Sequence, residues 1–203
     1  MQPLTPRLLV TLALVAAGTF VLAAAAATPA VAPLPDDPAC TAMDRKFMAR
    51  AIELVRDSVA QGRHPFSAVL VKDGLVLAEY QNSEDTTHDV TRHAETGLIS
   101  LMSPKLDRAT LAACTLYTST EPCTMCCGAI RFAGIGRVVY GVTETQMLLV
   151  MGLPPGAAPL ASREVFARTA PDVKVLGPLM EAEGLPLHVA YWSQHPLRFL
   201  PPK

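Results

Sequence analysis

Apolar residues recur along this chain with two different spacings, and the change between them marks the expected elements. Between Thr41 and Gly62 they return every three or four positions, which predicts an amphipathic helix that Gly62 can end. Residues 66–72 and 75–80 are short apolar runs that flank Asp73-Gly74, the dipeptide that favours a two-residue hairpin turn. The pattern therefore predicts one helix followed by an antiparallel pair of strands.

Strands and helices alternate after this hairpin. The same patterns predict further strands at 114–119, 137–142 and 173–176 and helices at 91–102, 123–133, 143–151 and 162–168. Residues 81–91 are polar and predict a loop. The pattern from residue 178 onwards is ambiguous and is compatible with a helix over 187–193. Alternation of strand and helix favours parallel pairing through crossover helices. Together with the hairpin, it predicts one three-layer α/β/α domain around a mixed five-stranded sheet.

The first 39 residues have a different composition. Residues 8–27 carry no charge and follow Arg7, and small residues come next, which predicts a signal peptide over residues 1–27. An uncleaved membrane anchor and a misassigned start codon are the alternatives. Residues 28–39 are rich in proline and predict an extended linker, so residues 40–203 are the expected domain. A cleaved signal predicts a periplasmic or secreted protein, with the membrane as a partner only if the segment is retained.

Composition narrows the class of partner. Half of the 203 residues are hydrophobic and 17% are charged, as in globular proteins. The formal net charge is −1, and residues 28–203 carry 16 basic and 18 acidic side chains. Proteins that bind nucleic acid usually have a basic excess. A nucleic-acid partner is therefore disfavoured, although a local basic patch would be compatible with this balance.

The cysteines point to a metal more than to disulfides. There are five, at positions 40, 114, 123, 126 and 127, and an odd number clustered as C-x-x-C-C is not a disulfide framework. We expect Cys114 and Cys127 to be buried core thiols. Cys123 and Cys126 are then left as candidate ligands.

Two short motifs carry the candidate chemistry, His93-Ala94-Glu95 and Pro122-Cys123-x-x-Cys126, and each opens a predicted helix. The positive end of a helix favours thiolates, and positions three apart point to one side. One imidazole and two thiolates suit Zn²⁺ and leave a fourth place for water. We therefore expect one zinc ion per chain on His93, Cys123 and Cys126, with Glu95 unligated and free to move protons.

Each motif alone also fits an interpretation without catalysis. A C-x-x-C pair is equally typical of a redox protein or of half a structural zinc site. A structural site would need a fourth protein ligand, and the nearest candidate, Cys127, points about 100° away around the helix. The non-enzymatic alternative is thus a zinc-stabilised or redox protein. A redox role predicts a Cys123–Cys126 disulfide and no metal.

Together the motifs resemble a known superfamily. Residues 65–71, Arg92–Glu95 and the run Thr115–Ile130 are similar to the cytidine deaminase-like proteins, in particular their guanine, cytosine and tRNA adenosine deaminases. The resemblance covers residues 43–142, about half of the chain. It implies the mixed five-stranded sheet, a homodimer, and hydrolytic release of ammonia in which Glu95 takes a proton from water and delivers it to a ring nitrogen.

The resemblance also implies a substrate pocket. In it Asn82 would hydrogen-bond the base, Phe66 and the backbone of Ala94 would line it, and Ser119 would lie beside the leaving amine. Tyr191 or Trp192 would close it. For Asn82 a turn residue, and for Phe66 plain core packing, are the alternatives.

The choice of substrate depends on the C-terminal part. A tRNA adenosine deaminase would be expected to carry basic residues there, whereas residues 179–192 are acidic and apolar. This favours a small molecule, a free nucleobase or nucleoside with guanine as first choice, and leaves tRNA adenosine as the alternative. Similar guanine deaminases carry an acid where this chain has residues 151–156, which contain none. Glu144 or a different base could account for that departure.

Overall fold

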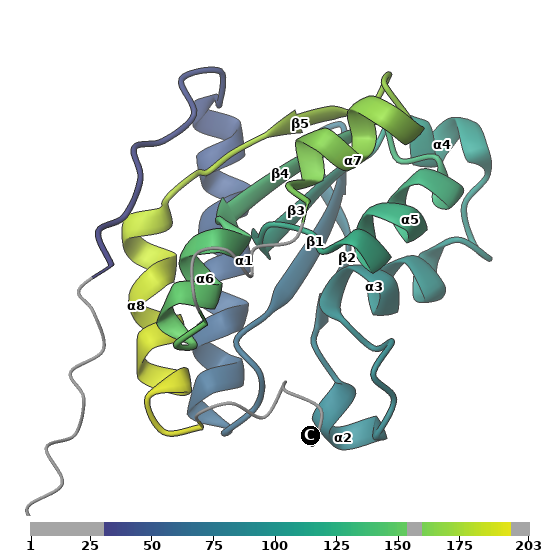
Figure 1. The fold of residues 1–203 in the computed structure, drawn as a ribbon. Helices are drawn as coiled ribbons and strands as arrows, with labels where there is room; N and C mark the ends of the chain where they lie inside the picture. Colours follow the sequence, from purple (N-terminus) through teal and green to yellow (C-terminus); the bar gives the residue numbers. More distant parts are fainter. Residues whose placement is uncertain (1–30, 154–159, 196–203) are drawn as a thin grey trace, which may run out of the picture.

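The computed structural model describes residues 31–153 and 160–195, which fold around one mixed sheet (Figure 1). Its strands are β1 (Ser67–Lys72), β2 (Leu75–Gln81), β3 (Thr115–Thr120), β4 (Arg137–Val142) and β5 (Lys174–Leu176), in the order β2-β1-β3-β4-β5. β1 pairs antiparallel with β2 and β3, and β3, β4 and β5 run parallel. The predicted five-stranded mixed sheet is confirmed.

Helices cover both faces of this sheet. α1 (Ala42–Ala60) and α8 (Glu181–Trp192) lie on one face; α3 (Ala94–Met102), α5 (Thr124–Ala133) and α7 (Ser162–Thr169) lie on the other, and α6 (Glu144–Val150) lies beside α8 (Figure 1). Successive side chains of a strand point to opposite faces. Accordingly Leu116 packs in the core under α3 and α5, and Tyr117 packs in the core under α1. The three-layer α/β/α prediction is confirmed.

Three helices differ most from the sequence prediction, and α3 begins at Ala94 instead of the expected residue 91. Two are the short helices α2 (Glu84–Thr87) and α4 (Arg108–Ala112), where no helix was predicted. The third, α8, begins six residues before the expected position and includes Gly184 and Pro186, both poor helix formers. Packing explains this helix, because a Cβ at Gly184 would lie 2.8 Å from Val142 Cγ2 of β4. A close approach of helix to strand outweighs the local propensity there.

The segment expected as a linker lies along the domain over residues 31–39 (Figure 1). It has no helix or strand, but Leu34 N–H donates to Glu181 at 2.5 Å and Asp36 accepts from Met180 N–H at 2.7 Å. Asp37 accepts from Gly177 N–H at 3.0 Å. The expected signal peptide lies outside the described residues. In the described part of the chain, the structure has no helix of sufficient length and hydrophobicity to cross a membrane.

Candidate active site

The two predicted motifs meet at the starts of two neighbouring helices. His93 is the N-cap of α3, and Cys123 is the N-cap of α5, which follows directly from the carboxyl end of β3. Both caps have extended backbone, so each side chain projects from the helix end. His93 Nδ1 lies 3.7 Å from Cys123 Sγ and 3.6 Å from Cys126 Sγ, and the two sulfurs are 3.6 Å apart.

This triangle of donor atoms fits zinc. A tetrahedral ion with Zn–S near 2.3 Å and Zn–N near 2.0–2.1 Å places such donors about 3.6–3.8 Å apart. In the part of the chain that the structure describes, no further His, Cys, Asp or Glu joins the three. Cys127, the candidate fourth ligand of a structural site, donates instead to the Pro122 carbonyl at 3.3 Å. One coordination place is therefore left for water.

The ligand cysteines share one proton in the absence of metal. The hydrogen bond from Cys126, helped by His93 and opposed by burial, lowers the pKa of Cys123 to about 4. The same hydrogen bond, together with burial, raises the pKa of Cys126. One sulfur is thus a thiolate at neutral pH, and a bound dication would displace the proton from the other.

Glu95 lies beside this set without belonging to it. It is 6% exposed, its Oε1 accepts a hydrogen bond of 2.9 Å from Thr118, and its Oε2 is 3.4 Å from Cys126 Sγ. Burial, followed by the negative charge on Cys123, raises the pKa of the carboxyl. A general acid–base group acts best when its pKa is close to the working pH. The site therefore places a buried carboxyl with a raised pKa next to the three candidate metal ligands.

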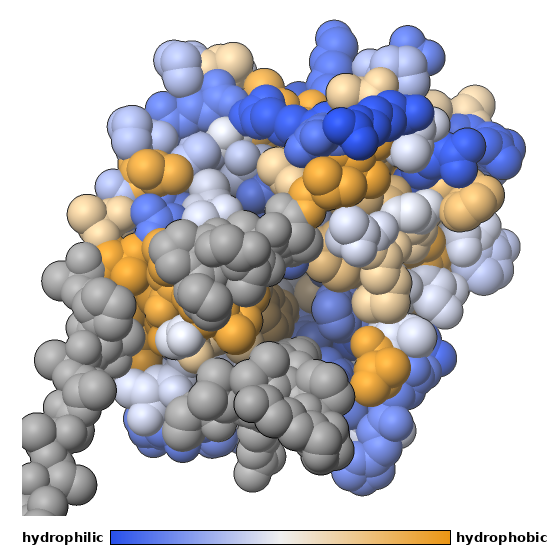
Figure 2. All heavy atoms as spheres, in the orientation of Figure 1, coloured by the Kyte–Doolittle hydropathy of each residue, from blue (hydrophilic) through white to orange (hydrophobic). Residues whose placement is uncertain are grey.

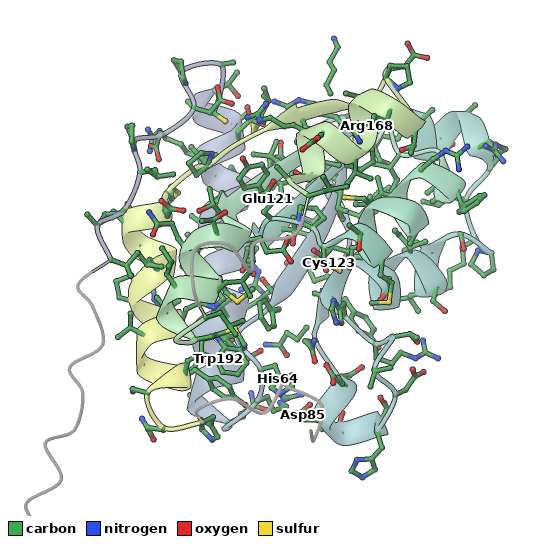
Figure 3. The ribbon with its side chains drawn as sticks, viewed as in Figure 1. His64, Asp85, Glu121, Cys123, Arg168 and Trp192 are labelled. Atoms are coloured by element: carbon green, nitrogen blue, oxygen red, sulfur yellow. The ribbon has the colours of Figure 1, made fainter. Side chains whose placement is uncertain are left out.

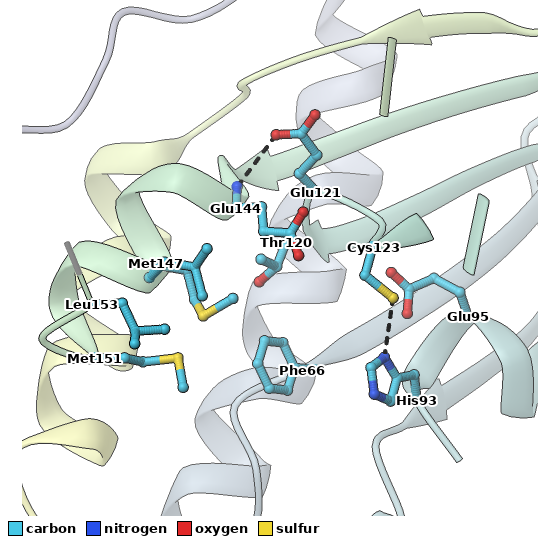
Figure 4. Close-up of a pocket in the computed structure, with 11 residues that line it drawn as sticks. Phe66, His93, Glu95, Thr120, Glu121, Cys123, Glu144, Met147, Met151 and Leu153 are labelled. Carbon is cyan, nitrogen blue, oxygen red and sulfur yellow. Dashed lines mark hydrogen bonds between the residues drawn. The ribbon is translucent and has the colours of Figure 1, made fainter. Parts of the chain in front are cut away.

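A cavity of about 340 Å³ opens beside Glu95 and the zinc ligands (Figure 4). The polar lining residues are His93, Glu95, Thr120, Glu121, Cys123 and Glu144. The apolar lining residues are Phe66, Met147, Leu148, Met151 and Leu153. On the face that Figure 2 shows, hydrophobic side chains gather over the region of α6 and α8. A concave, mainly apolar cavity with a few polar groups is typical of small-molecule sites.

The family comparison identifies the chemistry of this site. Residues 41–142, half of the chain, match the model of the cytidine and deoxycytidylate deaminase zinc-binding region. The chain belongs to this family of zinc deaminases. It is accordingly a zinc-dependent enzyme that hydrolyses a C–N bond of a nucleobase or nucleoside, and the enzymatic interpretation of the two motifs is confirmed.

Relatives of this deaminase act on different bases. A probable cytosine deaminase from Schizosaccharomyces pombe is 33% identical over 74% of this chain and 93% of its own length. A tRNA-specific adenosine deaminase from Agrobacterium fabrum is 39% identical over 49% of this chain and 66% of its own length. The structure of guanine deaminase from Nitrosomonas europaea superimposes with a TM-score of 0.63 and 27% identity, over 76% of this chain and 86% of that chain. The family assignment therefore leaves the base open.

The structure brings one of the five predicted substrate-binding residues of the deaminase to the cavity. Phe66 lines it, whereas Asn82, Ala94, Ser119 and Trp192 do not. Ser119 alternates with Thr118 on β3, so its side chain lies on the opposite face of the sheet from Glu95 and accepts a hydrogen bond of 3.0 Å from Ser67 N–H. Its position beside a leaving amine stays a prediction.

The other three are buried around the cavity. Asn82 is 2% exposed, and its Oδ1 accepts from Glu84 N–H at 2.9 Å. Ala94 is fully buried at the start of α3. Trp192 packs behind Phe66, with ring centroids 6.2 Å apart, and donates to His188 at 3.3 Å. Their contacts with substrate stay predictions as well.

Glu121 is a site residue that the sequence motifs do not single out. Its Oε1 accepts from Ser162 N–H at 2.8 Å and from the Ser162 hydroxyl at 2.7 Å, and its Oε2 accepts from Glu144 N–H at 3.3 Å (Figure 4). It thus joins the start of α6 to the start of α7. Its place directly before Pro122 and the first cysteine is the one local signal, but its partners lie 23 and 41 positions away in sequence.

Proposed function

We propose that this deaminase acts on a free nucleobase, with guanine as its first substrate. The observation that carries the proposal is the cavity, where zinc ligands and Glu95 lie at one end and five apolar side chains line the other. No Lys or Arg is among the lining residues that the structure describes. Such a wall suits the flat face of a base better than a sugar or a phosphate. The similarity to a guanine deaminase over 86% of that chain supports guanine.

The reaction proposed for Glu95 is proton transfer. Zinc, when held by His93, Cys123 and Cys126, supplies a water with lowered pKa. Glu95 takes a proton from the attacking water and gives it to the adjacent ring nitrogen of the base. Glu95 then takes the proton of the hydroxyl group now on the ring carbon and passes it to the exocyclic amine, so that the C–N bond breaks, ammonia leaves and the carbonyl of the product forms. Thr118, which donates to Glu95 Oε1, holds the carboxyl in place during both transfers.

The remaining site residues orient the base. Phe66 lies on the cavity surface and offers its ring to a base face. Asn82 Oδ1 accepts from Glu84 N–H, which holds the side chain in place, and its amide would donate to the base. The backbone of Ala94, at the start of α3, would line the pocket. Ser119, near the end of β3, would lie beside the leaving amine. Trp192 would support Phe66 from behind.

The second candidate substrate is adenosine in tRNA, which the Agrobacterium relative favours. The C-terminal helix counts against it. α8 carries Glu181 and Glu183 and no Lys or Arg, so it offers no positive charge to attract the phosphate backbone of an RNA.

Export and dimerisation belong to the same proposal. The uncharged run 8–27 supports a cleaved signal peptide and a periplasmic or secreted enzyme. Exposed apolar side chains on the neighbouring helices α3 and α5 support a homodimer, namely Leu101, Met125 and Phe132. Mass measurement of the exported protein tests cleavage, and light scattering tests the dimer.

The experiment that tests the activity is ammonia release by the zinc-loaded protein. Guanine, cytosine, adenine, their nucleosides and an adenosine-bearing tRNA anticodon stem-loop are compared at equal concentration. We expect guanine to give the highest kcat/KM and the RNA to give none. Release from RNA alone would select the second candidate. The absence of release from every base and nucleoside would refute the proposed function.

A further inference from the structure

A carboxyl oxygen without a partner lies in the cavity wall. Glu144 lines the cavity beside Glu121 and Thr120 (Figure 4), is 9% exposed, and has an Oε2 with no hydrogen-bond partner among the described residues. Buried polar atoms are almost always hydrogen-bonded. This oxygen is therefore expected to meet a group that enters the cavity.

Glu144 is held firmly in that wall. It is the first residue of α6, and its N–H donates to Glu121 at 3.3 Å. The preceding residue, Thr143, caps the helix and donates to the buried Glu181 from its N–H at 2.7 Å and its hydroxyl at 2.9 Å. These contacts fix the backbone from which the carboxyl projects. A fixed polar group is what discrimination between similar substrates requires.

The other acids of the cavity already have partners. Glu95 accepts from Thr118, and Glu121 accepts from Ser162 and from Glu144 N–H. Figure 3 labels Glu121 and Cys123 in the whole molecule, and Figure 4 shows both among the residues that line the cavity. Among the three lining carboxyl groups of the described residues, Glu144 has a buried oxygen without a hydrogen-bond partner, and the mechanism gives it no other role.

The surroundings favour the protonated form of this carboxyl. Burial is the largest cause that raises the pKa of Glu144, and the neighbouring carboxylate of Glu121 adds to it. A protonated carboxyl presents one donor and one acceptor side by side. Its complement on a base is a ring N–H next to a carbonyl, which is a lactam edge.

We propose that Glu144 determines specificity by pairing with the lactam edge of the base that is deaminated. The Glu144 hydroxyl donates to the carbonyl of the base, and the other oxygen accepts the ring N–H. Guanine and cytosine have such an edge, whereas adenine and 2-aminopurine lack it. The inference rests on the proposed function and narrows its substrate class to heterocycles that carry both an amine and a lactam.

Guanine and 2-aminopurine form the matched pair of substrates that tests this role, because both carry the amine at C2 and only guanine has the lactam. Steady-state kinetics would compare the wild type, Glu144→Leu, Glu144→Gln and, as control, Glu183→Leu at an exposed position of α8. We expect Glu144→Leu to lower kcat/KM for guanine about 100-fold, mainly through KM, and to leave 2-aminopurine within about threefold. The Gln amide has the same donor and acceptor, so Glu144→Gln should keep guanine turnover within about fivefold.

Several outcomes would overturn the role. They are an equal loss for both substrates in Glu144→Leu, no loss for either, or a loss in Glu144→Gln as large as in Glu144→Leu. Melting temperature and zinc content identify a variant that fails to fold, and Glu144→Met replaces Glu144→Leu in that case.

A binding measurement separates this inference from the proposed function. Calorimetry with 8-azaguanine, which keeps the lactam, compares Glu95→Gln with the double variant Glu95→Gln/Glu144→Leu. Binding weakened about 100-fold supports the role of Glu144 even if the wild type releases no ammonia from any base. Unchanged affinity refutes it whatever the activity.

Discussion

The two ends of the cavity are built in different ways. At the zinc end, the ligands His93 and Cys123 are caps of two adjacent helices, and Glu95 is held by Thr118. At the α6 end, the wall consists of flexible apolar side chains such as Met147 and of a carboxyl that lacks a partner. The rigid polar end is suited to one reaction. The α6 end, where adaptable apolar side chains surround one fixed carboxyl, is suited to selecting what reacts.

The sharpest test of this division is removal of the proton carrier. Glu95→Gln keeps the size of the side chain but cannot accept and return a proton, so we expect kcat to fall by about 10⁴-fold. Zinc content, measured by mass spectrometry, should stay at one ion per chain because Glu95 lies outside the ligand set. Glu164→Gln on the surface of α7 is the matched control. A variant that loses its zinc would show that Glu95 is a ligand.

The next largest effect is expected from a comparison of two adjacent cysteines, Cys126 and Cys127, in zinc binding and activity. Cys126→Ala removes a ligand and should weaken zinc binding by at least about 100-fold, with activity lost in proportion. Cys127→Ala removes a thiol that donates to the Pro122 carbonyl, and should keep its zinc and its activity. Titration with a chelator while activity is recorded compares the two. Equal zinc loss in both variants would mean that Cys127 belongs to the metal site.

At the other end, a smaller and different effect is expected. Met147→Ala removes apolar contact from the cavity wall, which is worth about 1–2 kcal/mol, so KM for the base should rise about tenfold while kcat changes little. Met43→Ala, at a position that is 51% exposed on α1, is the control. A fall in kcat with unchanged KM would contradict the assignment of substrate selection to this wall.

Disrupting a charged network outside the cavity should change the stability of the protein and leave its activity unchanged. Asp44 is 2% exposed and accepts from Arg137 at 2.7 and 2.9 Å and from Tyr117 at 2.8 Å. Burial opposes ionisation, but these hydrogen bonds prevail and hold the pKa of Asp44 below its usual value. We expect Asp44→Asn to cost about 2 kcal/mol of unfolding free energy at pH 7 and to leave kcat/KM unchanged.

The pH dependence of that difference follows from its sign. Because the pKa of Asp44 is lower in the folded protein, its contribution is complete above the unfolded pKa of about 3.9 and is lost as pH falls below it. Denaturant unfolding of the wild type and Asp44→Asn at pH 7 and at lower pH measures this. A difference that grows towards acid pH would contradict the assignment.

The two ends of the cavity also differ in how far the sequence predicts them. His93, Cys123, Cys126 and Glu95 follow from the amino-acid sequence alone, since helix-start motifs with fixed spacing report local geometry. Glu121 and the wall of α6 do not, because their roles depend on Ser162 and on packing against α8. The side chain of Ser119 lies on the face of α1 because side chains alternate along β3, and its place beside the amine stays a prediction.

The sequence by itself predicted the three candidate zinc ligands, the carboxyl beside them, the hairpin and the mixed sheet. Each of these depends on residues close together in the chain or on the period of apolar positions, which local physics specifies. Only the tertiary structure decided where α8 begins, how residues 31–39 lie on the domain, and that Glu144 faces the cavity without a partner. Those features arise from contacts between distant segments, whose burial and hydrogen bonds outweigh local propensity.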